Sequence, residues 1–572
     1  MGLSQAERKA DVIKKTGTAC VMRDGCRLAT DVYLPSEEGK WPAVLYRTPY
    51  GRNSLEADPL YSRFPELVAD GYAVVTQDLR GTGESEGTLG LNGQNEFDDG
   101  YDAVEWLAQQ PFCDGSVGMF GLSYPGFVQN AAASRRPPHL KAVCPFMCPS
   151  QQPFGIRKGH VRHMQHLFWA YAQTLAHPDN YIPDASRRED VLLQMRENFS
   201  RLEEMIAQKP PAECEAAQIP EVPILKDYLD VMDGAEDPEY WKKMHMPIDF
   251  DQVRVPALFG TGWLDGAREW TIDSYLAARR SRDPLTREHA RLIIGIWPHG
   301  GDMPDTVEGT DYTPAASGRN AGVFESMHRW FDLWLKGKEE EEEPRVRYFV
   351  RGSNLWRTAE DWPPEGKTWK LYLHADGTLS EHSERQGGQV SYTVDPADPM
   401  PSAITDRAGR RMTADWQDLG ERKDAALFVT SPLEKERTLA GTMKMHLYAS
   451  ADTPDTDYAC RLFDIAPDGR RTELLAGLIR ARHERRLFDP EMIAPGEVHE
   501  YCFDAGNAAN MFAAGHRIGL QVMGQLYPDY DRNMNTGEST AHGMHMRTSR
   551  HTLYTGAEQA SCLEMNLIGT EE

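Results

Sequence analysis

The stretch Gly118-Met119-Phe120-Gly121-Leu122-Ser123-Tyr124-Pro125-Gly126 decides how the first part of the chain folds. It places a serine between two glycines, directly after a short apolar run and before a second one. This arrangement is typical of a nucleophile elbow, a sharp strand-to-helix turn that presents a serine hydroxyl at strained backbone angles. Side chains near the serine would collide with the turn, so Gly121 and Gly126 leave room, although Gly126 comes one residue later than usual. The alternative is an ordinary Gly-Ser turn. We predict that Ser123 is a nucleophile at the end of a strand.

The sequence around this stretch alternates strand and helix patterns. Residues 42–46 and 72–77 are short apolar runs typical of buried strands, and residues 97–107 repeat apolar side chains at helical spacing. Strand, helix, strand, elbow and helix in succession imply a parallel sheet with crossover helices. We therefore expect the first part of an α/β-hydrolase core over residues 1–144.

The core pattern is interrupted and then resumes. Between residues 145 and 246, methionines, aromatic residues and charges follow helical periods that prolines break, which predicts an inserted helical cap. Apolar runs at residues 255–259 and 292–296 restore the strand pattern, and residues 324–335 form a helical pattern after them. The second part of the core is accordingly expected over residues 247–340.

The last part of the chain has a different character. Residues 336–344 hold a charge run followed by a proline, which is typical of a solvated linker. Short segments beyond it alternate polar and apolar residues or run apolar between turn residues, among them residues 346–350, 369–373, 443–448 and 518–522. We expect residues 345–572 to form an all-β jelly-roll domain.

The composition excludes several classes of protein. A chain of 572 residues is too long for one ordinary core, and 40% hydrophobic with 26% charged residues describes a folded protein. The net charge of −25 disfavours nucleic acid as a partner, because phosphates attract basic surfaces. No apolar run is long enough to cross a bilayer, so we expect no membrane partner. The first residues lack a secretion core and the nine scattered cysteines do not suggest a disulfide framework, which predicts a cytoplasmic location.

A serine nucleophile needs a base and an acid that orients the base. In α/β-hydrolases these follow the serine in the order Asp or Glu, then His, each after a strand. Here Asp265 follows the strand pattern at residues 255–259, and His299 follows the one at 292–296. Either residue alone would suggest a turn aspartate or a surface histidine. Their order and placement together predict a triad of Ser123, Asp265 and His299.

The tetrahedral intermediate of such a reaction needs two hydrogen-bond donors for its oxyanion. The backbone N–H of Tyr124, directly after the serine, is expected to be one of them. The second donor is expected from the loop that follows an early strand, at residues 46–52.

These residues carry a family resemblance. The chain resembles the cocaine esterase and X-prolyl dipeptidyl-peptidase group of serine hydrolases, also called CocE/NonD, over nearly its whole length. The matching segments are 47–50 (RTPY), 78–87 (DLRGTGESEG), 121–124 (GLSY), 262–266 (GWLDG), 297–299 (WPH), 330–337 (WFDLWLKG) and 531–537 (DRNMNTG). The resemblance implies an α/β-hydrolase core with a helical cap and a C-terminal jelly roll. It also implies that the hydroxyl of Tyr50 completes the oxyanion hole, a role that suits a neutral phenol.

The substrate is predicted from departures within the resemblance. Relatives that act on α-amino acid derivatives hold the substrate ammonium with acids, two of which closely follow the catalytic aspartate. This chain has Ala267 and Arg268 there, and Arg157 near another such position. Like charges repel in a desolvated pocket, so an ammonium substrate is disfavoured. Arg268, together with Arg157, could instead bind a substrate carboxylate, unless these arginines pair with local acids such as Glu269.

Two features shape the expected pocket. Relatives with an aromatic residue at the position of Ala267 use it as a wall, so the alanine predicts a wider acyl site. The cap run at residues 166–171, which contains Trp169, could supply aromatic walls or could be a packed helix face.

We expect no metal and no cofactor. The histidines at 160, 163 and 166 and the pair at 542 and 545 lack the carboxylate or thiolate partners of a metal site. The glycines near residue 83 lack dinucleotide-loop spacing.

The sequence therefore predicts a serine hydrolase that cleaves a small-molecule ester or amide through an acyl-enzyme. An X-Pro dipeptidyl-peptidase or α-amino-acid ester hydrolase with the same triad is the alternative. A non-catalytic jelly-roll binding protein is a third reading, disfavoured by the complete triad. Family habit favours a homodimer or higher homo-oligomer.

Overall fold

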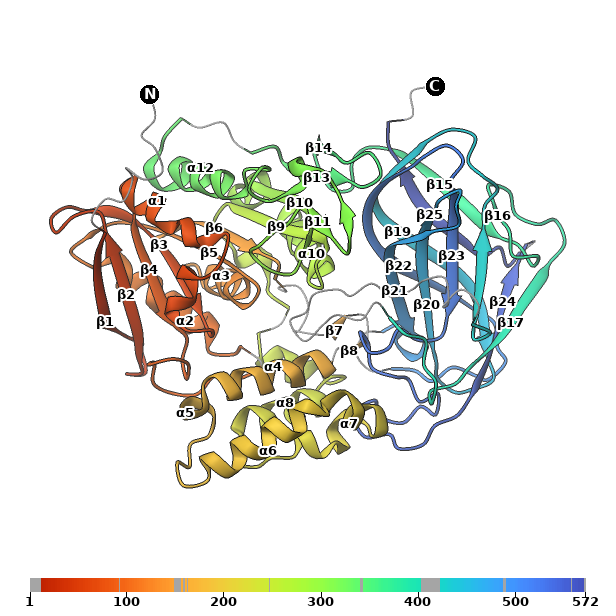
Figure 1. Cartoon of the computed structure of the whole chain (residues 1–572), viewed down its shortest axis with the longest axis horizontal. Helices are drawn as coiled ribbons and strands as arrows, with labels where there is room; N and C mark the ends of the chain where they lie inside the picture. Colours follow the sequence, from red (N-terminus) through yellow and green to blue (C-terminus); the bar gives the residue numbers. More distant parts are fainter. Residues whose placement is uncertain are drawn as a thin grey trace.

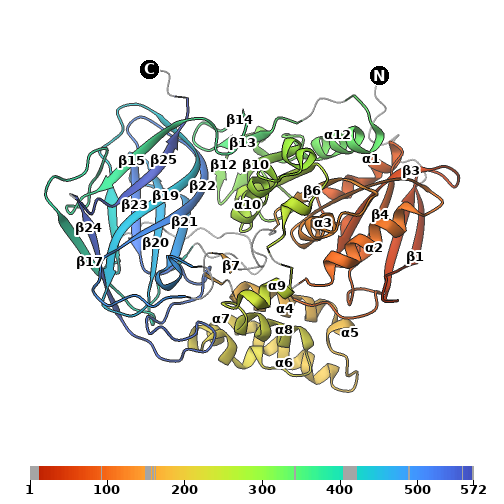
Figure 2. The same cartoon turned by 180° about the vertical axis from the view of Figure 1, so that it is seen from behind.

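The computed structural model describes residues 12–91, 93–148, 156–157, 160–161, 163–245, 247–339, 343–402, 422–486, 490–556 and 558–569. Figure 1 shows three parts: a sheet with helices around it, a group of helices below it, and a β-sandwich at its side. Figure 2 shows the same three parts from behind.

A ten-stranded sheet forms the α/β-hydrolase core. Its strands run in the spatial order β1 (Ile13–Val21), β2 (Arg27–Leu34), β4 (Ala73–Asp78), β3 (Trp41–Thr48), β5 (Cys113–Leu122), β6 (Leu140–Phe146), β9 (Ala257–Leu264), β10 (Ala290–Pro298), β13 (Val346–Val350) and β14 (Leu355–Ala359). From β4 to β13 neighbouring strands are parallel, and the outer pairs are antiparallel. Every residue of β4, β9 and β10 is buried, which explains why these strands are apolar runs without alternation.

Helices cover the core sheet. They are α1 (Phe64–Ala69), α2 (Glu96–Ala108), α3 (Tyr124–Ser134), α10 (Arg268–Arg279), α11 (Pro284–Glu288) and α12 (Val323–Lys336). On α12, Phe331 packs edge-on against Phe120 of β5, and Gly118 of the same strand lies beneath that ring. The strand that precedes Ser123, β5, is thus packed on one side against α12.

The first strands after the predicted linker are a correction to the expected domain boundary. Residues 346–350 were expected to open the jelly roll, but β13 pairs in parallel with β10 and β14 pairs with β13. They extend the core sheet because the edge of β10 offers unpaired backbone groups that an apolar strand can cover. The all-β domain begins with β15.

The group of helices lies between β6 and β9 in the chain. Its elements are the short strands β7 (Ile156–Arg157) and β8 (His160–Val161) and the helices α4 (His163–Ala176), α5 (Pro178–Tyr181), α6 (Arg188–Ser200), α7 (Leu202–Gln208), α8 (Pro223–Asp233) and α9 (Pro238–Lys243). We call this part the cap. The β7–β8 pair was not anticipated in a segment expected to be helical.

Two antiparallel sheets form the C-terminal sandwich. The larger sheet contains β16 (Leu379–Ser380), β15 (Lys367–Leu373), β25 (Cys562–Leu567), β19 (Arg437–Ala451), β24 (Ser549–Thr555) and β17 (Gly388–Val394), with β22 (His499–Phe512) also on β19. The smaller one contains β18 (Ala425–Val429), β23 (Arg517–Met523), β20 (Asp457–Ile465) and β21 (Arg471–Arg480). One apolar cluster with side chains from both sheets fills the space between them.

Polar contacts join the sandwich to the other two parts. Glu269 on α10 accepts hydrogen bonds from the backbone and the side-chain amide of Asn507 on β22, at 2.8 and 2.6 Å. His542 of the sandwich bonds to Glu213 and Asp233 of the cap, both at 2.7 Å. These bonds fix the cap and the sandwich around the carboxyl ends of the core strands.

No helix among the described residues is both long enough and apolar enough to span a bilayer.

Candidate active site

Ser123 lies at the turn between β5 and α3. Its backbone angles, φ 65° and ψ −127°, lie in a region that residues with a Cβ rarely adopt. The turn is held by a hydrogen bond of 2.9 Å from Ser123 N to the carbonyl of Phe146 on β6. Gly121 is required at its position, because its φ is 148° and a Cβ there would lie 2.5 Å from Cβ of Pro125. The strained geometry is that of a nucleophile elbow.

Asp265 and His299 meet at the ends of the adjacent strands β9 and β10. Nδ1 of His299 lies 2.7 Å from Oδ1 of Asp265, whose side chain is completely buried. The carboxylate also accepts a hydrogen bond of 2.9 Å from the backbone N–H of Ala267 and one of 2.6 Å from Oγ1 of Thr261. Three donors thus hold the carboxylate in one orientation.

This contact changes the pKa of both groups. Burial alone would raise the pKa of the Asp265 carboxyl, but the charge and hydrogen bond of His299, with the other donors, lower it below its ordinary value. Burial alone would lower the pKa of His299, but the charge of Asp265 and the hydrogen bond raise it. The pair therefore favours an aspartate anion beside an imidazole whose Nδ1 carries the proton. That tautomer leaves Nε2 free to act as a base.

The loops that carry Ser123 and His299 meet at the end of β6. Phe146 accepts the backbone hydrogen bond of Ser123, and the next residue, Met147, accepts one of 3.4 Å at Sδ from the backbone N–H of Gly300. Ser123 is therefore hydrogen-bonded to Phe146, and Gly300, which follows His299, is hydrogen-bonded to the next residue, Met147. This places the predicted serine and the Asp265–His299 pair at one edge of the sheet.

Tyr50 lies against the serine. Its hydroxyl accepts a hydrogen bond of 3.4 Å from the indole of Trp169. Burial raises the pKa of Tyr50, and the nearby polar groups of Trp169 and Ser123 offset only part of that effect. The phenol consequently keeps its proton at neutral pH and can donate a hydrogen bond beside the serine. Tyr124 begins α3, where the backbone N–H groups of the first turn have no partner within the helix.

Trp169 on α4 reaches the site from the cap. Its indole Nε1 donates a hydrogen bond of 3.4 Å to the hydroxyl of Tyr50, and its ring stacks on that of Tyr124 with centroids 5.7 Å apart and planes 3° from parallel. Sequence reasoning placed Trp169 near the substrate but gave no sign of these two contacts. Tyr171, two residues on, points elsewhere: its hydroxyl donates to the carbonyl of Ala216 inside the cap.

The structure places the remaining predicted pocket residues as follows. Nε of Arg268 lies 2.8 Å from Oε1 of Glu269, and its Nη1 donates a hydrogen bond of 2.6 Å to the carbonyl of Trp263. The arginine therefore pairs with its local acid at the border with the sandwich, as in the alternative weighed from the sequence. Ala267 is buried at the start of α10. The backbone of Arg157 lies in β7, but its side chain is outside the described residues.

Thr261 is a contributor that sequence reasoning missed. It lies inside β9, where a threonine gives no signal beyond its preference for strands. Its hydroxyl meets the Asp265 carboxylate because the chain turns back after β9, four residues further on, and the pairing of β9 with β10 then brings His299 to the same carboxylate.

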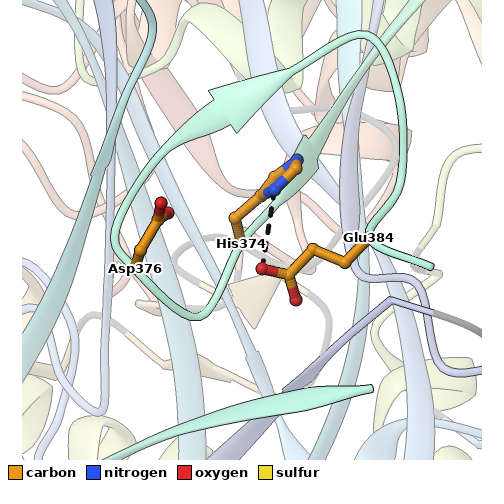
Figure 3. Close-up of side chains that lie close together, drawn as sticks. All are labelled: His374, Asp376 and Glu384. Atoms are coloured by element: carbon orange, nitrogen blue, oxygen red, sulfur yellow. Dashed lines mark ion pairs between the residues drawn. The ribbon is translucent and has the colours of Figure 1, made fainter. Parts of the chain in front are cut away.

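A group of side chains in the sandwich could in principle hold a metal ion. The ligand atoms of His374, Asp376 and Glu384 all lie within 4.8 Å of one another (Figure 3). Oδ1 of Asp376 already accepts hydrogen bonds from the backbone and hydroxyl of Thr378, and Glu384 accepts one from Thr555. These bonds account for Asp376 as part of the turn between β15 and β16 and for Glu384 as a contact with β24, so we assign no metal there. The expectation of a metal-free and cofactor-free protein stays a prediction.

The fold and the site together define a class of protein. A parallel sheet whose strand ends carry a strained serine at a strand-to-helix turn, followed in the chain by an aspartate–histidine pair, is the arrangement of α/β-hydrolase serine hydrolases.

Comparison with known proteins identifies the family. Residues 24–301 match the X-Pro dipeptidyl-peptidase (S15 family), and residues 338–564 match the X-Pro dipeptidyl-peptidase C-terminal non-catalytic domain. The cocaine esterase of Rhodococcus sp. (strain MB1 Bresler) is 30% identical to the chain, over 96% of this chain and 97% of that protein. The chain belongs to the cocaine esterase and X-Pro dipeptidyl-peptidase (S15) family, and it is a serine hydrolase.

Solved structures share the fold over its full length. An aminopeptidase from the marine sediment archaeon Thaumarchaeota archaeon matches with a TM-score of 0.83 and 23% identity, covering 100% of this chain and 98% of that one. An α-amino acid ester hydrolase matches with a TM-score of 0.80 and 22% identity, covering 99% and 98%. These likenesses confirm the predicted fold, an α/β-hydrolase core with a cap and an all-β C-terminal domain.

Proposed function

We propose that the chain hydrolyses a carboxylic ester of a small molecule, with Ser123 as the nucleophile, His299 as the base and Asp265 as the acid of the triad. The observation that carries this assignment is the 2.7 Å contact between His299 Nδ1 and the buried Asp265 carboxylate, at the same sheet edge as the strained serine. It supports the tautomer that a general base requires.

The reaction would proceed through an acyl-enzyme. Oγ of Ser123 attacks the carbonyl carbon while Nε2 of His299 accepts the serine proton, and the carbonyl oxygen becomes an oxyanion. The hydroxyl of Tyr50 and the backbone N–H of Tyr124 donate hydrogen bonds to that oxyanion. As the bond to the leaving group breaks, His299 returns the proton to the departing oxygen. Water then attacks the acyl group with His299 again as base, which releases the acid and restores Ser123.

The side chains after the catalytic aspartate favour a substrate without an ammonium group. Ala267 offers no charge, and the guanidinium of Arg268 is bound to Glu269 and to a backbone carbonyl. Glu269 is engaged by Arg268 and Asn507. An ammonium would therefore find no uncommitted acid at these positions, whereas a neutral ester needs none.

Two experiments test the proposal. A fluorophosphonate probe should label the wild-type protein and fail to label Ser123→Ala; labelling that survives in the variant would refute the assignment of the nucleophile. The protein should then be assayed with p-nitrophenyl acyl esters, X-Pro-anilides and α-amino-acid esters. We expect the simple esters to have the highest kcat/KM, and a preference for either of the other classes would favour the peptidase or amino-acid-ester alternative.

The cytoplasmic location and the homo-oligomer remain predictions from the sequence. Light scattering on the purified chain measures the assembly directly.

A further inference from the structure

Trp169 contacts both residues from which the oxyanion donors come. Its indole N–H reaches the hydroxyl of Tyr50, 119 residues away in the chain, and its ring lies flat on the ring of Tyr124. It stands on α4 in the cap, whereas Tyr50 follows β3 and Tyr124 begins α3 in the core. One side chain of the cap thus joins the two halves of the proposed oxyanion hole.

The hydrogen bond from Trp169 has a direction that matters for catalysis. An indole can only donate, so the phenol oxygen of Tyr50 must be the acceptor. With its oxygen engaged on that side, the proton of the Tyr50 hydroxyl is left to donate elsewhere, and the Ser123 side chain is close enough to affect the pKa of this hydroxyl. Accepting one hydrogen bond also polarises a hydroxyl and makes it a stronger donor. The contact therefore both orients and strengthens the donor.

The stack on Tyr124 fixes where the indole lies. Both rings are held in parallel planes, and Tyr124 is itself packed edge-on against Phe127 on the next turn of α3. The stack joins Trp169 to α3, which follows the serine turn. The N–H of Trp169 therefore points at the Tyr50 hydroxyl only while the cap packs on the core.

We propose that Trp169 is a positioning residue that orients the Tyr50 hydroxyl for oxyanion stabilisation and so makes the oxyanion hole depend on the docked cap. This inference rests on the proposed function and adds to it a role for the cap in the chemical step. A residue that only walled the substrate pocket would act on substrate binding instead.

The test is a double-mutant cycle with Trp169→Phe and Tyr50→Phe. Trp169→Phe removes the N–H and retains a ring for the stack. We expect it to lower kcat for p-nitrophenyl acetate and butyrate on the order of tenfold, with KM unchanged, since one hydrogen bond to the donor is lost. Tyr50→Phe should lower kcat by about 10²- to 10³-fold, as for removal of an oxyanion donor. The double variant should be no slower than Tyr50→Phe alone, because the indole acts through the hydroxyl.

A second readout measures the oxyanion hole without turnover. A trifluoromethyl ketone forms a tetrahedral adduct with the serine, and its affinity should fall in Trp169→Phe by the same factor as kcat. The matched control is Tyr171→Phe, which removes a hydroxyl from the same helix but bonds only inside the cap. It should leave kcat and adduct affinity unchanged.

Three outcomes would overturn the inference: an unchanged kcat in Trp169→Phe, a loss that is additive with Tyr50→Phe, or a change confined to KM that varies with the acyl chain. If Trp169→Phe fails to fold by circular dichroism, Trp169→His, which keeps a ring N–H, should restore more activity than Trp169→Leu; equal activities would refute the role of the N–H. Failure of the proposed function is separate, because it would show as hydrolysis and labelling that persist in Ser123→Ala.

Discussion

Replacing Asp265 by asparagine should remove a charge from the site while leaving its hydrogen bonds in place. Oδ1 accepts from the backbone N–H of Ala267 and faces Nδ1 of His299, so the amide oxygen of the new residue must take that position. The amide nitrogen then faces Oγ1 of Thr261, which in the wild type lies 2.6 Å from Oδ2 of Asp265. The threonine hydroxyl can rotate from donor to acceptor and so keep this hydrogen bond. The substitution thus tests the charge of Asp265 separately from its shape.

The magnitude follows from the charge that is lost. The carboxylate stabilises the imidazolium that forms when His299 takes the serine proton. Two unit charges about 4 Å apart interact by about 4 kcal/mol at an effective dielectric of about 20. Each 1.4 kcal/mol corresponds to a factor of ten, and the amide dipole retains part of the interaction. We therefore expect kcat/KM to fall by about 10²- to 10³-fold.

The pH dependence should change as well. His299 must be neutral to act as a base, so kcat/KM of the wild type should rise with pH through a midpoint above 6.5, because Asp265 raises the pKa of His299. In Asp265→Asn the attraction of the carboxylate charge is lost and burial, the largest cause, lowers the pKa of His299, so the midpoint should move to lower pH.

The assay is p-nitrophenyl acetate hydrolysis from pH 5 to 9, with product followed at its isosbestic wavelength, and circular dichroism to confirm folding. Asp265→Ala serves as a comparison, since it removes the charge and the hydrogen bonds together and should be slower still. An Asp265→Asn protein with a wild-type rate, or with a slow rate and an unmoved midpoint, would refute the coupling of these two side chains.

Three further predictions concern the structure around the site. Gly262→Ala should destabilise the protein by more than about 2 kcal/mol, because a Cβ there would lie 2.1 Å from a carbonyl oxygen of β10; Gly387→Ala, where the closest atom is 3.9 Å away, is the control in thermal unfolding. Arg268→Ala should lower the free energy of unfolding by about 1–3 kcal/mol, because the partly buried Glu269 loses its charged partner and keeps the hydrogen bonds from Asn507. It should change kcat/KM equally for neutral and anionic esters; a loss confined to anionic esters would instead support carboxylate binding. Hydrogen bonds to two cap acids, Asp233 first, raise the pKa of His542. The protonated histidine therefore stabilises the folded state below pH about 6.5, and this stabilisation is lost as the pH rises through the raised pKa. Between pH 6 and 8 the Tm of the wild type should fall more than that of His542→Gln. The corresponding difference in the free energy of unfolding should be less than about 1 kcal/mol, because the histidine is partly exposed. Equal slopes of Tm against pH in the two proteins would contradict this.

Much of the fold could be predicted because the patterns that encode it are local. Runs of buried residues such as residues 72–77 and 292–296 predict strands within a few residues of β4 and β10. The glycines around Ser123 predict its strained turn because they are adjacent to it in the chain. The end of the α/β pattern at residue 340 was less informative, since β13 joins the core through pairs such as Leu292 with Val346, which are far apart in the chain and which no local pattern indicates.

The amino-acid sequence by itself determined the strained serine turn and the order of the serine, aspartate and histidine along the strands, because backbone strain and strand formation depend on neighbouring residues. Only the tertiary structure decided the partners of the side chains that surround them. Trp169 meets the Tyr50 hydroxyl across the boundary of cap and core, and Asn507 of the sandwich meets Glu269 of the core. Such contacts depend on how separate parts of the chain dock, and docking geometry is set by the packing of whole surfaces rather than by any short stretch of residues.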